Sequence, residues 1–265
     1  MRKSSPKRCK PLQVLSLKAW TSPPKRYLLG RVVVGMLRFV ASLLLRLEVQ
    51  GVERVPRTGP VVLIGNHVNF IDPALAYIVH RRYIKGMTAI ETYRRFFFNF
   101  LAWSVDAIPV ERGMPDRRAI RACVEALNAG WALYVAPEGT RSGHGRLQRG
   151  LAGITLILLQ AGAHIPIYPM VYIGLEHFWP NLRRLRRTPV RVVVGEPFYL
   201  SPPAERVRRE VREQITAELM GQIAALLPPE SRGVYADQAT KAPQYLRPAS
   251  QPGICQNKFR ASTPP

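Results

Sequence analysis

Cysteine is scarce in this sequence, and the cysteines that are present lie far apart. The chain has three, Cys9, Cys123 and Cys255, and none has the spacing of a zinc site or a thiol-redox motif. Cys123 falls on the apolar face of an expected helix, where a small buried thiol accounts for it. We therefore expect no metal site and no bound cofactor, and we do not expect the protein to work in an oxidising compartment.

Acidic residues are also few. The chain carries 17 Asp and Glu against 39 Lys and Arg, which gives a formal net charge of +22. Such an excess of positive charge predicts an anionic partner: a nucleic acid, an acidic membrane surface or a phosphorylated substrate. Hydrophobic residues make up 47% of the 265 residues, so a wholly disordered chain is excluded and one sizeable core is expected.

A long hydrophobic run without charges is missing as well. Residues 27–49 come nearest, since spanning a bilayer takes about 20 apolar residues, but Arg31, Arg38 and Arg46 interrupt them. On a helix these arginines lie on one side and form a basic stripe on an otherwise apolar surface. This pattern favours an amphipathic helix in the membrane interface, with its arginines on anionic head groups. An ordinary core helix and a true membrane span remain alternatives.

Composition divides the remainder of the chain into a central domain and two ends. Prolines and basic residues dominate residues 1–26, which we expect to be a poorly ordered arm without a secretory signal. Residues 50–227 have the patterning of a globular domain. Pro, Ser, Gln and Gly dominate residues 228–265, which are predicted to be a disordered tail.

Within the central domain, short apolar runs alternate with amphipathic segments. Strands are expected over residues 59–65, 106–110, 132–136, 165–173 and 190–194, and helices over residues 74–79, 115–129, 151–161 and 204–227. Strands that alternate with helices form parallel sheets. The sequence therefore predicts an α/β fold with a largely parallel sheet flanked by helices.

A histidine and an aspartate at a strand-to-helix turn are the first candidates for catalysis. His67 follows the first expected strand of the domain, and Asp72 opens the next helix. A histidine accepts a proton near neutral pH, and a carboxylate on its other ring nitrogen fixes the tautomer and stabilises the imidazolium. No serine or cysteine stands beside the pair in the sequence, which fits direct attack by a substrate hydroxyl. Taken alone, the pair also fits a helix-capping aspartate beside an unrelated histidine.

Two further groups of residues follow other expected strands. The segment Ala136–Ser142 contains Gly139, which lets the backbone approach a ligand closely, and Arg141, whose planar guanidinium suits a phosphate. Glu138 is predicted to hold Arg141 in place. Arg112 stands at the end of the strand before it, where open α/β sheets place ligands. In isolation, each group also fits a surface turn or a solvated arginine.

The order of these groups along the chain carries a family resemblance. They are Asn66-His67-x4-Asp72, Glu111-Arg112-Gly113, the run PEGTRS from Pro137 to Ser142, and the run IPIYP from Ile165 to Pro169. With this arrangement the sequence closely resembles the glycerolipid acyltransferase family, typified by the 1-acyl-glycerol-3-phosphate acyltransferases. The resemblance covers roughly Gly51 to Tyr199.

The resemblance implies a role for each group. His67 is implied to be the catalytic base, assisted by Asp72. Pro166 is implied to shape the acyl-donor side of the site. Binding of the acceptor phosphate is implied for Arg112 and for the loop of Glu138, Gly139, Thr140 and Arg141.

This chain departs from the family pattern at three positions. Asp106 stands where the second motif usually begins with glycine, and Pro109 stands where an aromatic residue is usual. Ala136 likewise replaces an aromatic residue at the start of the third motif. These changes leave His67 untouched. They bear on the acceptor pocket, and therefore on which lysolipid is used.

The resemblance implies an enzyme of phospholipid synthesis at the cytoplasmic face of a membrane. It would transfer a fatty acyl group from acyl-CoA or acyl carrier protein to the free hydroxyl of lysophosphatidate, a lysophospholipid. An acceptor with another head group, such as an amino-acid lipid, and a thioesterase that uses water remain open. The anionic membrane surface is an expected partner, and Arg183, Arg184, Arg186, Arg187 and Arg191 form a second basic cluster that either rests on head groups or is merely solvated.

Two other classes of protein explain part of the sequence. A non-catalytic membrane-binding module accounts for the basic patches, but not for a His–Asp pair together with a Pro-Glu-Gly-Thr-Arg loop. A nucleic-acid-binding protein accounts for the charge. However, the sequence has no zinc-finger spacing, glycine–aromatic RNA motif or heptad-linked basic region, so we expect no nucleic-acid partner.

Overall fold

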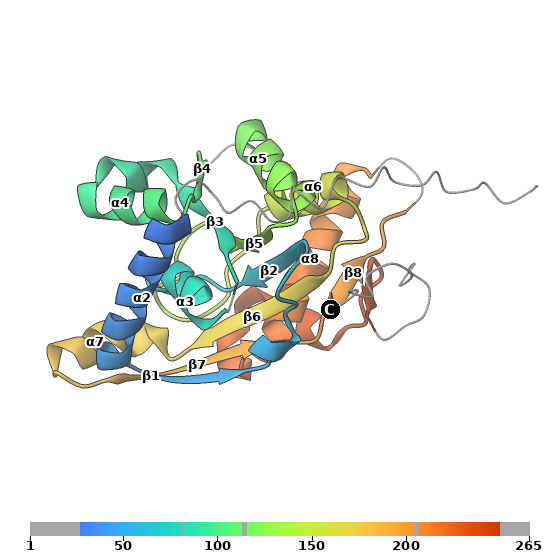
Figure 1. Ribbon diagram of the computed structural model, residues 1–265. Helices are drawn as coiled ribbons and strands as arrows, with labels where there is room; N and C mark the ends of the chain where they lie inside the picture. Colours follow the sequence, from blue (N-terminus) through green and yellow to red (C-terminus); the bar gives the residue numbers. More distant parts are fainter. Residues whose placement is uncertain (1–26, 81, 113–115, 204–206, 250–265) are drawn as a thin grey trace, which may run out of the picture.

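A central β-sheet with helices on both faces organises the structure, a computed structural model that describes residues 27–80, 82–112, 116–203 and 207–249 (Figure 1). The described strands are β1 (Leu45–Gln50), β2 (Val61–Gly65), β3 (Ile84–Ala89), β4 (Ile108–Val110), β5 (Ala132–Val135), β6 (Ile167–Ile173), β7 (Thr188–Val194), β8 (Phe198–Leu200) and β9 (Leu246–Pro248). The arm predicted over residues 1–26 lies outside the described residues.

Parallel pairing dominates the sheet. The strand order is β1-β7-β6-β2-β5-β3-β4, with β8 paired to β6 and β9 paired to β8. Every neighbouring pair from β6 to β4 is parallel, and β1 is parallel to β7. Strands β7 and β8 run antiparallel to β6, and β9 runs antiparallel to β8. The predicted α/β fold with a largely parallel sheet is confirmed.

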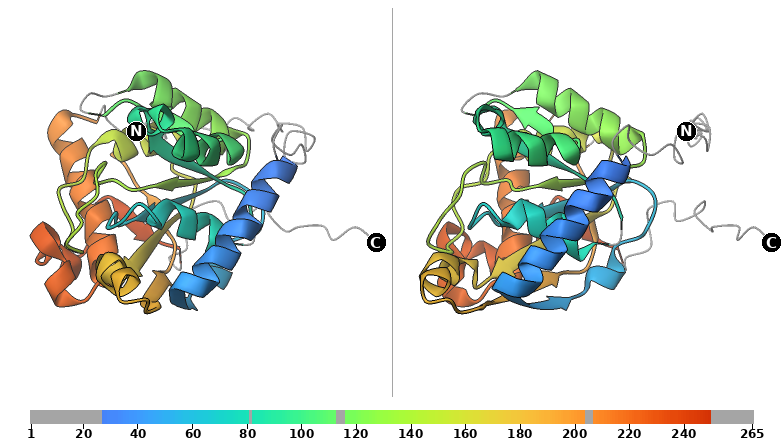
Figure 2. Two further views of the ribbon diagram at one scale, coloured as in Figure 1. Left: turned by 90° about the vertical axis from the view of Figure 1, so that its left-hand side faces the viewer. Right: turned by 60° about the vertical axis from the view of Figure 1, so that its left-hand side comes forward.

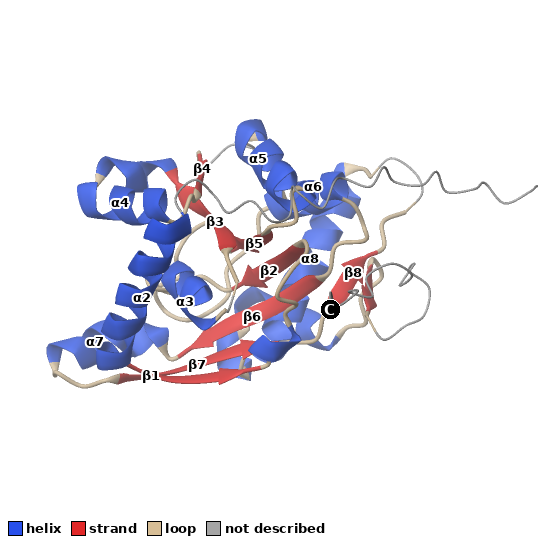
Figure 3. Ribbon diagram, in the orientation of Figure 1, coloured by secondary structure: helices blue, strands red, loops and turns tan. Residues whose placement is uncertain are grey.

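Helices enclose the sheet on its two faces (Figure 3). The described α-helices are α2 (Tyr27–Leu44), α3 (Asp72–Val79), α4 (Phe96–Ser104), α5 (Arg117–Asn128), α6 (Gly153–Ala161), α7 (Phe178–Arg183) and α8 (Arg209–Leu226). Short 3-10 turns cover Val52–Arg54, Ile90–Arg94, Leu175–His177, Pro229–Ser231, Gly233–Tyr235 and Gln238–Thr240. One buried cluster joins the sheet to α5, α6 and α8, and a second joins it to α2, α3 and α7.

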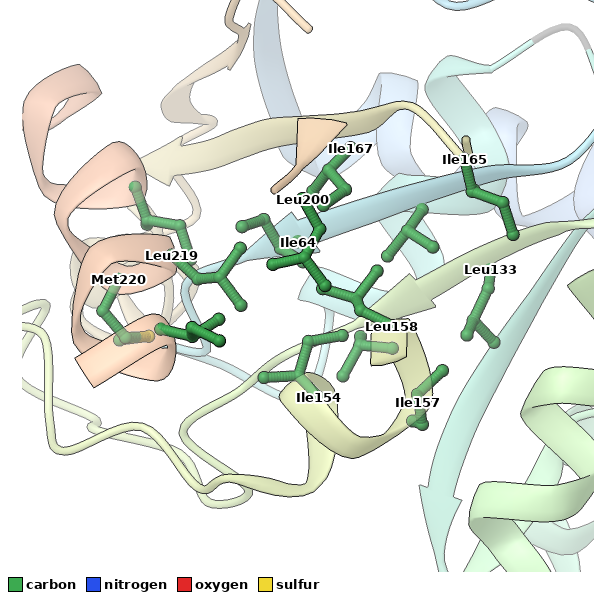
Figure 4. Close-up of a cluster of buried hydrophobic side chains, with 14 of the residues drawn as sticks. Ile64, Leu133, Ile154, Ile157, Leu158, Ile165, Ile167, Leu200, Leu219 and Met220 are labelled. Carbon is green, nitrogen blue, oxygen red and sulfur yellow. The ribbon is translucent and has the colours of Figure 1, made fainter. Parts of the chain in front are cut away.

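The strand β2 shows why the central strands are apolar throughout. Successive side chains point to opposite faces of a sheet. Val62 and Ile64 belong to the cluster under α5, α6 and α8, whereas Val61 and Leu63 belong to the opposite cluster. Figure 4 shows Ile64 within the first of these clusters, beside side chains of α6 and α8. Because both faces are covered, polar alternation is absent and the strand was visible in the sequence as a continuous apolar run.

The helix predicted over residues 27–49 is too long. It ends at Leu44, and Leu45–Gln50 form β1, which pairs in parallel with β7. The residues of β1 alternate between apolar and polar, and Leu45 at the start of the strand is buried. Pairing with β7 therefore outweighs the helical periodicity that the apolar residues also fit. Among the described residues, no helix is long and apolar enough to cross a membrane.

The basic stripe predicted on this helix is not formed. Arg46 lies on β1 rather than on α2. Arg38 donates to the backbone oxygens of Ile78 (3.0 Å) and His80 (3.3 Å), at the carboxyl end of α3. It therefore satisfies carbonyl groups that the end of a helix leaves unpaired, rather than pointing to anionic head groups.

The prediction of a disordered tail over residues 228–265 is wrong for residues 228–249. This segment folds back beside α8 and ends in β9. Tyr235 and Leu246 are buried, and the Tyr235 hydroxyl accepts from the Gly150 N–H (2.9 Å). The contributing apolar residues are isolated and follow no period, so no sequence pattern marks the segment. Residues 250–265 lie outside the described residues.

Candidate active site

The candidate residues follow strands whose carboxyl ends lie at one edge of the sheet. His67 comes two residues after β2, residues 136–142 follow β5, and Arg112 comes two residues after β4. Because β2, β5, β3 and β4 are neighbours and parallel, the loops after them emerge at the same edge. Open α/β sheets bind ligands at this edge.

His67 and Asp72 form a hydrogen-bonded pair. The His67 Nδ1 lies 2.9 Å from Asp72 Oδ2, and the same oxygen accepts the backbone N–H groups of Val68 and Asn69. Asp72 is the first residue of α3 and is fully buried, while the His67 side chain keeps 12% of its surface exposed. Burial raises the pKa of Asp72, and the three N–H donors oppose that rise by stabilising the carboxylate.

The surroundings of Asp72 fix the orientation of the imidazole. A carboxylate oxygen that already accepts two backbone N–H groups calls for a third donor, so the proton of a neutral His67 lies on Nδ1. The other nitrogen, Nε2, is then the acceptor. This is the tautomer that a general base needs, with the basic nitrogen directed away from the buried carboxylate.

Glu138 acts on His67 rather than on Arg141. Its Oε1 accepts the backbone N–H of His67 (2.7 Å), and its Oε2 accepts the backbone N–H of Gln148 (2.9 Å). The side chain is buried, which raises its pKa to about 7 although both hydrogen bonds favour the ionised form. The prediction that Glu138 holds Arg141 is therefore wrong. Both carboxylate oxygens are used to join two backbone segments.

The loop after β5 is joined to the loop after β2. The Ser142 N–H donates to the His67 carbonyl (2.8 Å), and the Gly143 N–H donates to the Val68 carbonyl (3.2 Å). Arg141 directly precedes this contact, and the side chains of Thr140 and Arg141 are exposed. The structure thus brings the predicted phosphate-binding loop next to the histidine.

Gly139 lies in a tight turn, and its predicted close approach to a ligand stays a prediction. Its φ is 66°, a left-handed conformation that favours glycine, and its N–H closes a turn onto the Ala136 carbonyl (3.1 Å). A Cβ at this position would lie 2.5 Å from the Leu151 Cδ1. The positive φ of the turn favours glycine here, whereas the exposed Leu151 side chain could move aside.

The register of the sheet puts Arg112 at the level of residues 66–72, which carry the candidate base His67 and are called the catalytic loop below. Gly86 in β3 aligns with Tyr134 in β5, which aligns with Leu63 in β2. Val110 aligns with Ala89, three residues beyond Gly86, and therefore lies level with the residue before His67. Arg112 comes two residues after this edge strand and has an exposed side chain. About 4.8 Å separates neighbouring strands, so the backbones of β2 and β4 are about 14 Å apart.

Pro166 does not lie beside His67. It precedes β6, and its carbonyl accepts the Val62 N–H at the amino end of β2 (3.0 Å). At about 3.3 Å per residue, the four residues from Val62 to Asn66 carry the chain about 13 Å towards the opposite edge of the sheet. Pro166 therefore lies at the opposite edge of the sheet from His67, and its role on the acyl-donor side stays a prediction.

Two asparagines of the catalytic loop were not assigned a role from the sequence. The Asn66 side chain donates to the Tyr172 carbonyl (2.9 Å) and accepts the Tyr172 N–H (2.8 Å), which ties the loop to the end of β6. Asn69 Nδ2 donates to the Leu175 carbonyl (3.2 Å). Both asparagines are buried. Their position on either side of His67, directly after an apolar strand, was the available signal.

Residues 46–173 match the family model described as Acyltransferase, and this range contains every candidate residue described above. The chain is similar to the acyltransferase family over this range, which is just under half of its length. Similar proteins in this family include the chloroplastic 1-acyl-sn-glycerol-3-phosphate acyltransferase BAT2 of Brassica napus, 27% identical over 67% of this chain and 52% of the relative. The 1-acyl-sn-glycerol-3-phosphate acyltransferase of Pseudomonas aeruginosa is 21% identical over 76% of this chain and 77% of the relative.

The family fold is also seen in a solved structure. The crystal structure of the 1-acyl-sn-glycerophosphate acyltransferase PlsC from Thermotoga maritima aligns with a TM-score of 0.55 and 20% identity, over 77% of this chain and 82% of that chain. This likeness confirms the acyltransferase fold. The chain spans about half the length of the first plant relatives that it matches, 52% for BAT2 and 49% for LPAT1 of Arabidopsis thaliana.

Proposed function

We propose that this protein transfers a fatty acyl group from acyl-CoA or acyl carrier protein to the free hydroxyl of lysophosphatidate, in phospholipid synthesis. The His67–Asp72 pair carries the proposal, because its buried carboxylate, held by two backbone N–H groups, sets the tautomer of a general base. Similarity to proteins named 1-acyl-sn-glycerol-3-phosphate acyltransferase supports this choice of reaction.

The reaction then follows from these groups. His67 Nε2 takes the proton of the lysolipid hydroxyl while the oxygen attacks the thioester carbonyl. The tetrahedral intermediate collapses, the C–S bond breaks, and the imidazolium returns its proton to the departing thiolate. A base of this kind contributes about 10²–10⁴ in rate. Glu138 and the two asparagines act as positioning residues, because they hold the backbone on both sides of His67.

Binding of the acceptor is assigned to the two exposed arginines at this edge. Arg141 precedes the residue that hydrogen-bonds to His67, and Arg112 follows the end of the edge strand β4, whose Val110 lies level with the residue before His67. A guanidinium binds a phosphate through two parallel N–H groups. Thr140 adds an exposed hydroxyl beside Arg141. With its phosphate on these side chains, a lysophosphatidate presents its free hydroxyl to His67.

A membrane surface is the proposed working place, with the protein on the cytoplasmic face. Six large apolar side chains on α2 are exposed, at a spacing that puts them along one side of the helix: Leu28 (76%), Val32 (55%), Met36 (65%), Phe39 (66%), Val40 (46%) and Leu43 (58%). An apolar row of this kind suits a helix that lies in the interface of a bilayer. The net charge of +22 favours an anionic lipid surface.

The proposal is tested by incubating the purified protein with a labelled acyl thioester and a mixture of lysolipids, followed by mass identification of the product. We expect acylated lysophosphatidate, and a loss of at least ~100-fold for His67→Ala at unchanged thermal stability. His164→Ala is the matched control, since this exposed histidine precedes β6 at the opposite edge of the sheet.

Each other outcome identifies a different function. Another acylated lysolipid, such as an amino-acid lipid, would correct the acceptor and leave the chemistry in place. Release of thiol without an acylated lipid would identify a thioesterase. Vesicle binding without any turnover would identify a non-catalytic membrane module, and a normal rate for His67→Ala would refute the assigned base.

A further inference from the structure

A strip of aromatic rings crosses the catalytic loop. Phe97 and Phe98 of α4 lie 5.5 Å apart between ring centroids, and Phe98 lies 6.1 Å from Phe70, which is three residues after His67. Phe70 in turn stacks on Trp179 of α7 at 5.6 Å. Phe97 is 62% exposed, Phe70 36% and Trp179 49%. These rings, the aromatic strip, leave much apolar surface in water.

The aromatic strip belongs to a ring of elements on one side of the molecule. Figure 2 shows α2, α4 and α7 on the side that carries the catalytic loop. The amino-terminal part of α2 touches α4, because a Cβ on Gly30 would lie 2.9 Å from the Ser104 carbonyl. At the other end of α2, Arg187 donates to the Leu45 carbonyl (2.7 Å), which joins the turn after α7 to the end of the helix. Helix α2 therefore contacts α4, which carries part of the aromatic strip, at one end and the turn after α7, which carries Trp179, at the other.

The turn after α7 holds a leucine in an unfavourable conformation. The N–H groups of Leu185 and Arg186 donate to the carbonyls of Leu182 (3.0 Å) and Asn181 (2.9 Å), which is the pairing of a Schellman helix end. Leu185 occupies the left-handed position of this motif, with φ 51°. Glycine is usual there because a side chain costs energy. The Leu185 side chain is nevertheless 94% exposed, so packing within the described protein does not explain it.

Exposed arginines surround this leucine. Arg183, Arg184 and Arg186 adjoin it in sequence and are all exposed. The two other members of the basic cluster found in the sequence are engaged elsewhere. Arg187 binds the Leu45 carbonyl, and Arg191 pairs with Glu48 at 3.3 Å. A projecting apolar side chain inside a group of guanidinium groups matches the boundary between the head groups and the acyl chains of an anionic bilayer.

We propose that Leu185 and the aromatic strip form a membrane contact distinct from α2, and that its occupant is an anionic phospholipid bilayer. Glycine would adopt the left-handed conformation of this turn at a lower energetic cost than leucine. We therefore explain the leucine by a contact of its side chain outside the protein, in the bilayer. Phe70 then sets the catalytic loop at the lipid surface. The inference rests on the proposed function only in that the acceptor is a lipid of that bilayer.

The sharpest test is Leu185→Gly in the full chain, measured by cosedimentation with vesicles of phosphatidylglycerol and phosphatidylcholine. This change removes the inserted side chain and relieves the backbone, so we expect unchanged or higher thermal stability but about tenfold weaker vesicle binding. A role in folding alone would lower the stability and leave the binding unchanged. Binding of Leu185→Gly equal to wild type would overturn the inference.

Two matched controls separate this effect from general ones. Asp106→Gly makes the same backbone change at the other described non-glycine residue with positive φ, which carries no exposed apolar side chain. Val234→Ala removes part of a 68% exposed apolar side chain from the segment beside α8. Both should bind vesicles like wild type. A comparable loss in either control would also count against the inference.

Fluorescence tests the contact directly. Quenching by vesicles with brominated acyl chains should fall when Trp179 is changed to Phe, because the indole then no longer contributes quenched emission. Identical quenching in both proteins, or a Leu185-dependent dimer without vesicle binding, would contradict the bilayer as the occupant.

Acyl transfer distinguishes this inference from the proposed function. Leu185→Gly should lose activity towards lysolipid in vesicles and keep it towards lysolipid dispersed in detergent. If wild-type protein acylates no lysolipid in either form but binds vesicles through Leu185, the proposed reaction fails and the membrane contact stands.

Discussion

The buried polar side chains around His67 hold the backbone on both sides of this histidine. Asp72 and Glu138 are buried, and their oxygens accept N–H groups on both sides of the histidine. Asn66 adds two hydrogen bonds to the end of β6. The imidazole is therefore held by its neighbours in a defined orientation before any substrate binds, as general-base catalysis requires.

The charge of the buried carboxylate predicts the effect of Asp72→Asn. An amide oxygen in the place of Oδ2 can accept the same three N–H groups, from His67, Val68 and Asn69, but the amide has no charge to stabilise the imidazolium that forms when His67 takes up the proton. We expect the kcat of acyl transfer to fall ~10³-fold with little change in the acceptor KM. Steady-state kinetics at pH 7 measure this split. A kcat within about threefold of wild type would show that the charge of Asp72 does not assist His67.

Helices α5 and α4 both end in a turn that contains a residue with positive φ. Helix α5 ends with Gly130 at φ 83°, where the N–H groups of Gly130 and Trp131 donate to the carbonyls of Leu127 and Ala126. Helix α4 ends in the same way, but Asp106 takes the left-handed position at φ 51°. This geometry explains why glycine is usual at that position in the family. Asp106 is kept in place by its ion pair with Lys85.

Two substitutions of Asp106 separate the contribution of its backbone conformation to stability from that of its ion pair with Lys85. Asp106→Asn removes the charge and keeps a side chain that tolerates positive φ, so a loss of about 0.5–1 kcal/mol is expected. Asp106→Gly removes the same charge and also the steric cost, so it should be about 0.5–1 kcal/mol more stable than Asp106→Asn. Urea unfolding of the three proteins measures both differences. The backbone explanation fails if the glycine variant is the less stable of the two.

Over the whole molecule, the layers around the sheet also bury an ionisable group that takes no part in the candidate site, His80. His80 follows α3, is 3% exposed, and has an Nε2 without a hydrogen-bond partner among the described residues. Burial, and then the neighbouring Arg82, lower its pKa to about 4. The folded protein therefore holds a neutral imidazole where the unfolded chain takes up a proton near pH 6.5.

This difference in the pKa of His80 between the folded and unfolded chain predicts that the protein loses stability at pH values above those at which carboxylates usually titrate. Stability from the neutral His80 is complete above about pH 6.5 and is lost as the pH falls towards about 4. His80→Leu cannot take up the proton. Between pH 7 and 4.5 the free energy of unfolding of wild type should therefore fall by about 2 kcal/mol relative to the variant. Urea unfolding at both pH values measures this. If the free energy of unfolding changed with pH in the same way in both proteins, His80 would not be the source of the acid sensitivity. The titration of Glu138, which acts in the opposite direction, cancels because both proteins contain this residue.

Much of the fold and of the site was predictable because the signals are local. The apolar run Val61–Gly65 marked a strand covered on both faces, and Gly130 marked the end of α5. The histidine and the aspartate lie within one turn between strand and helix, so their pairing depends on few residues. The strand β1 was misassigned although its residues alternate, because the apolar stretch before it also fits a helix.

Contacts between distant segments were beyond sequence reasoning. Glu138 lies 71 residues from His67 along the chain, and the loop between them supplies no pattern that pairs its carboxylate with backbone N–H groups rather than with an arginine. Pro166 lies in a recognisable motif, but only the strand direction shows that it enters at the far edge. Residues that are close in the sequence, such as His67 and Asp72, can be paired from the sequence alone. The partner of a buried charged side chain such as Glu138 depends on which strands become neighbours, and the packing of the whole sheet decides that.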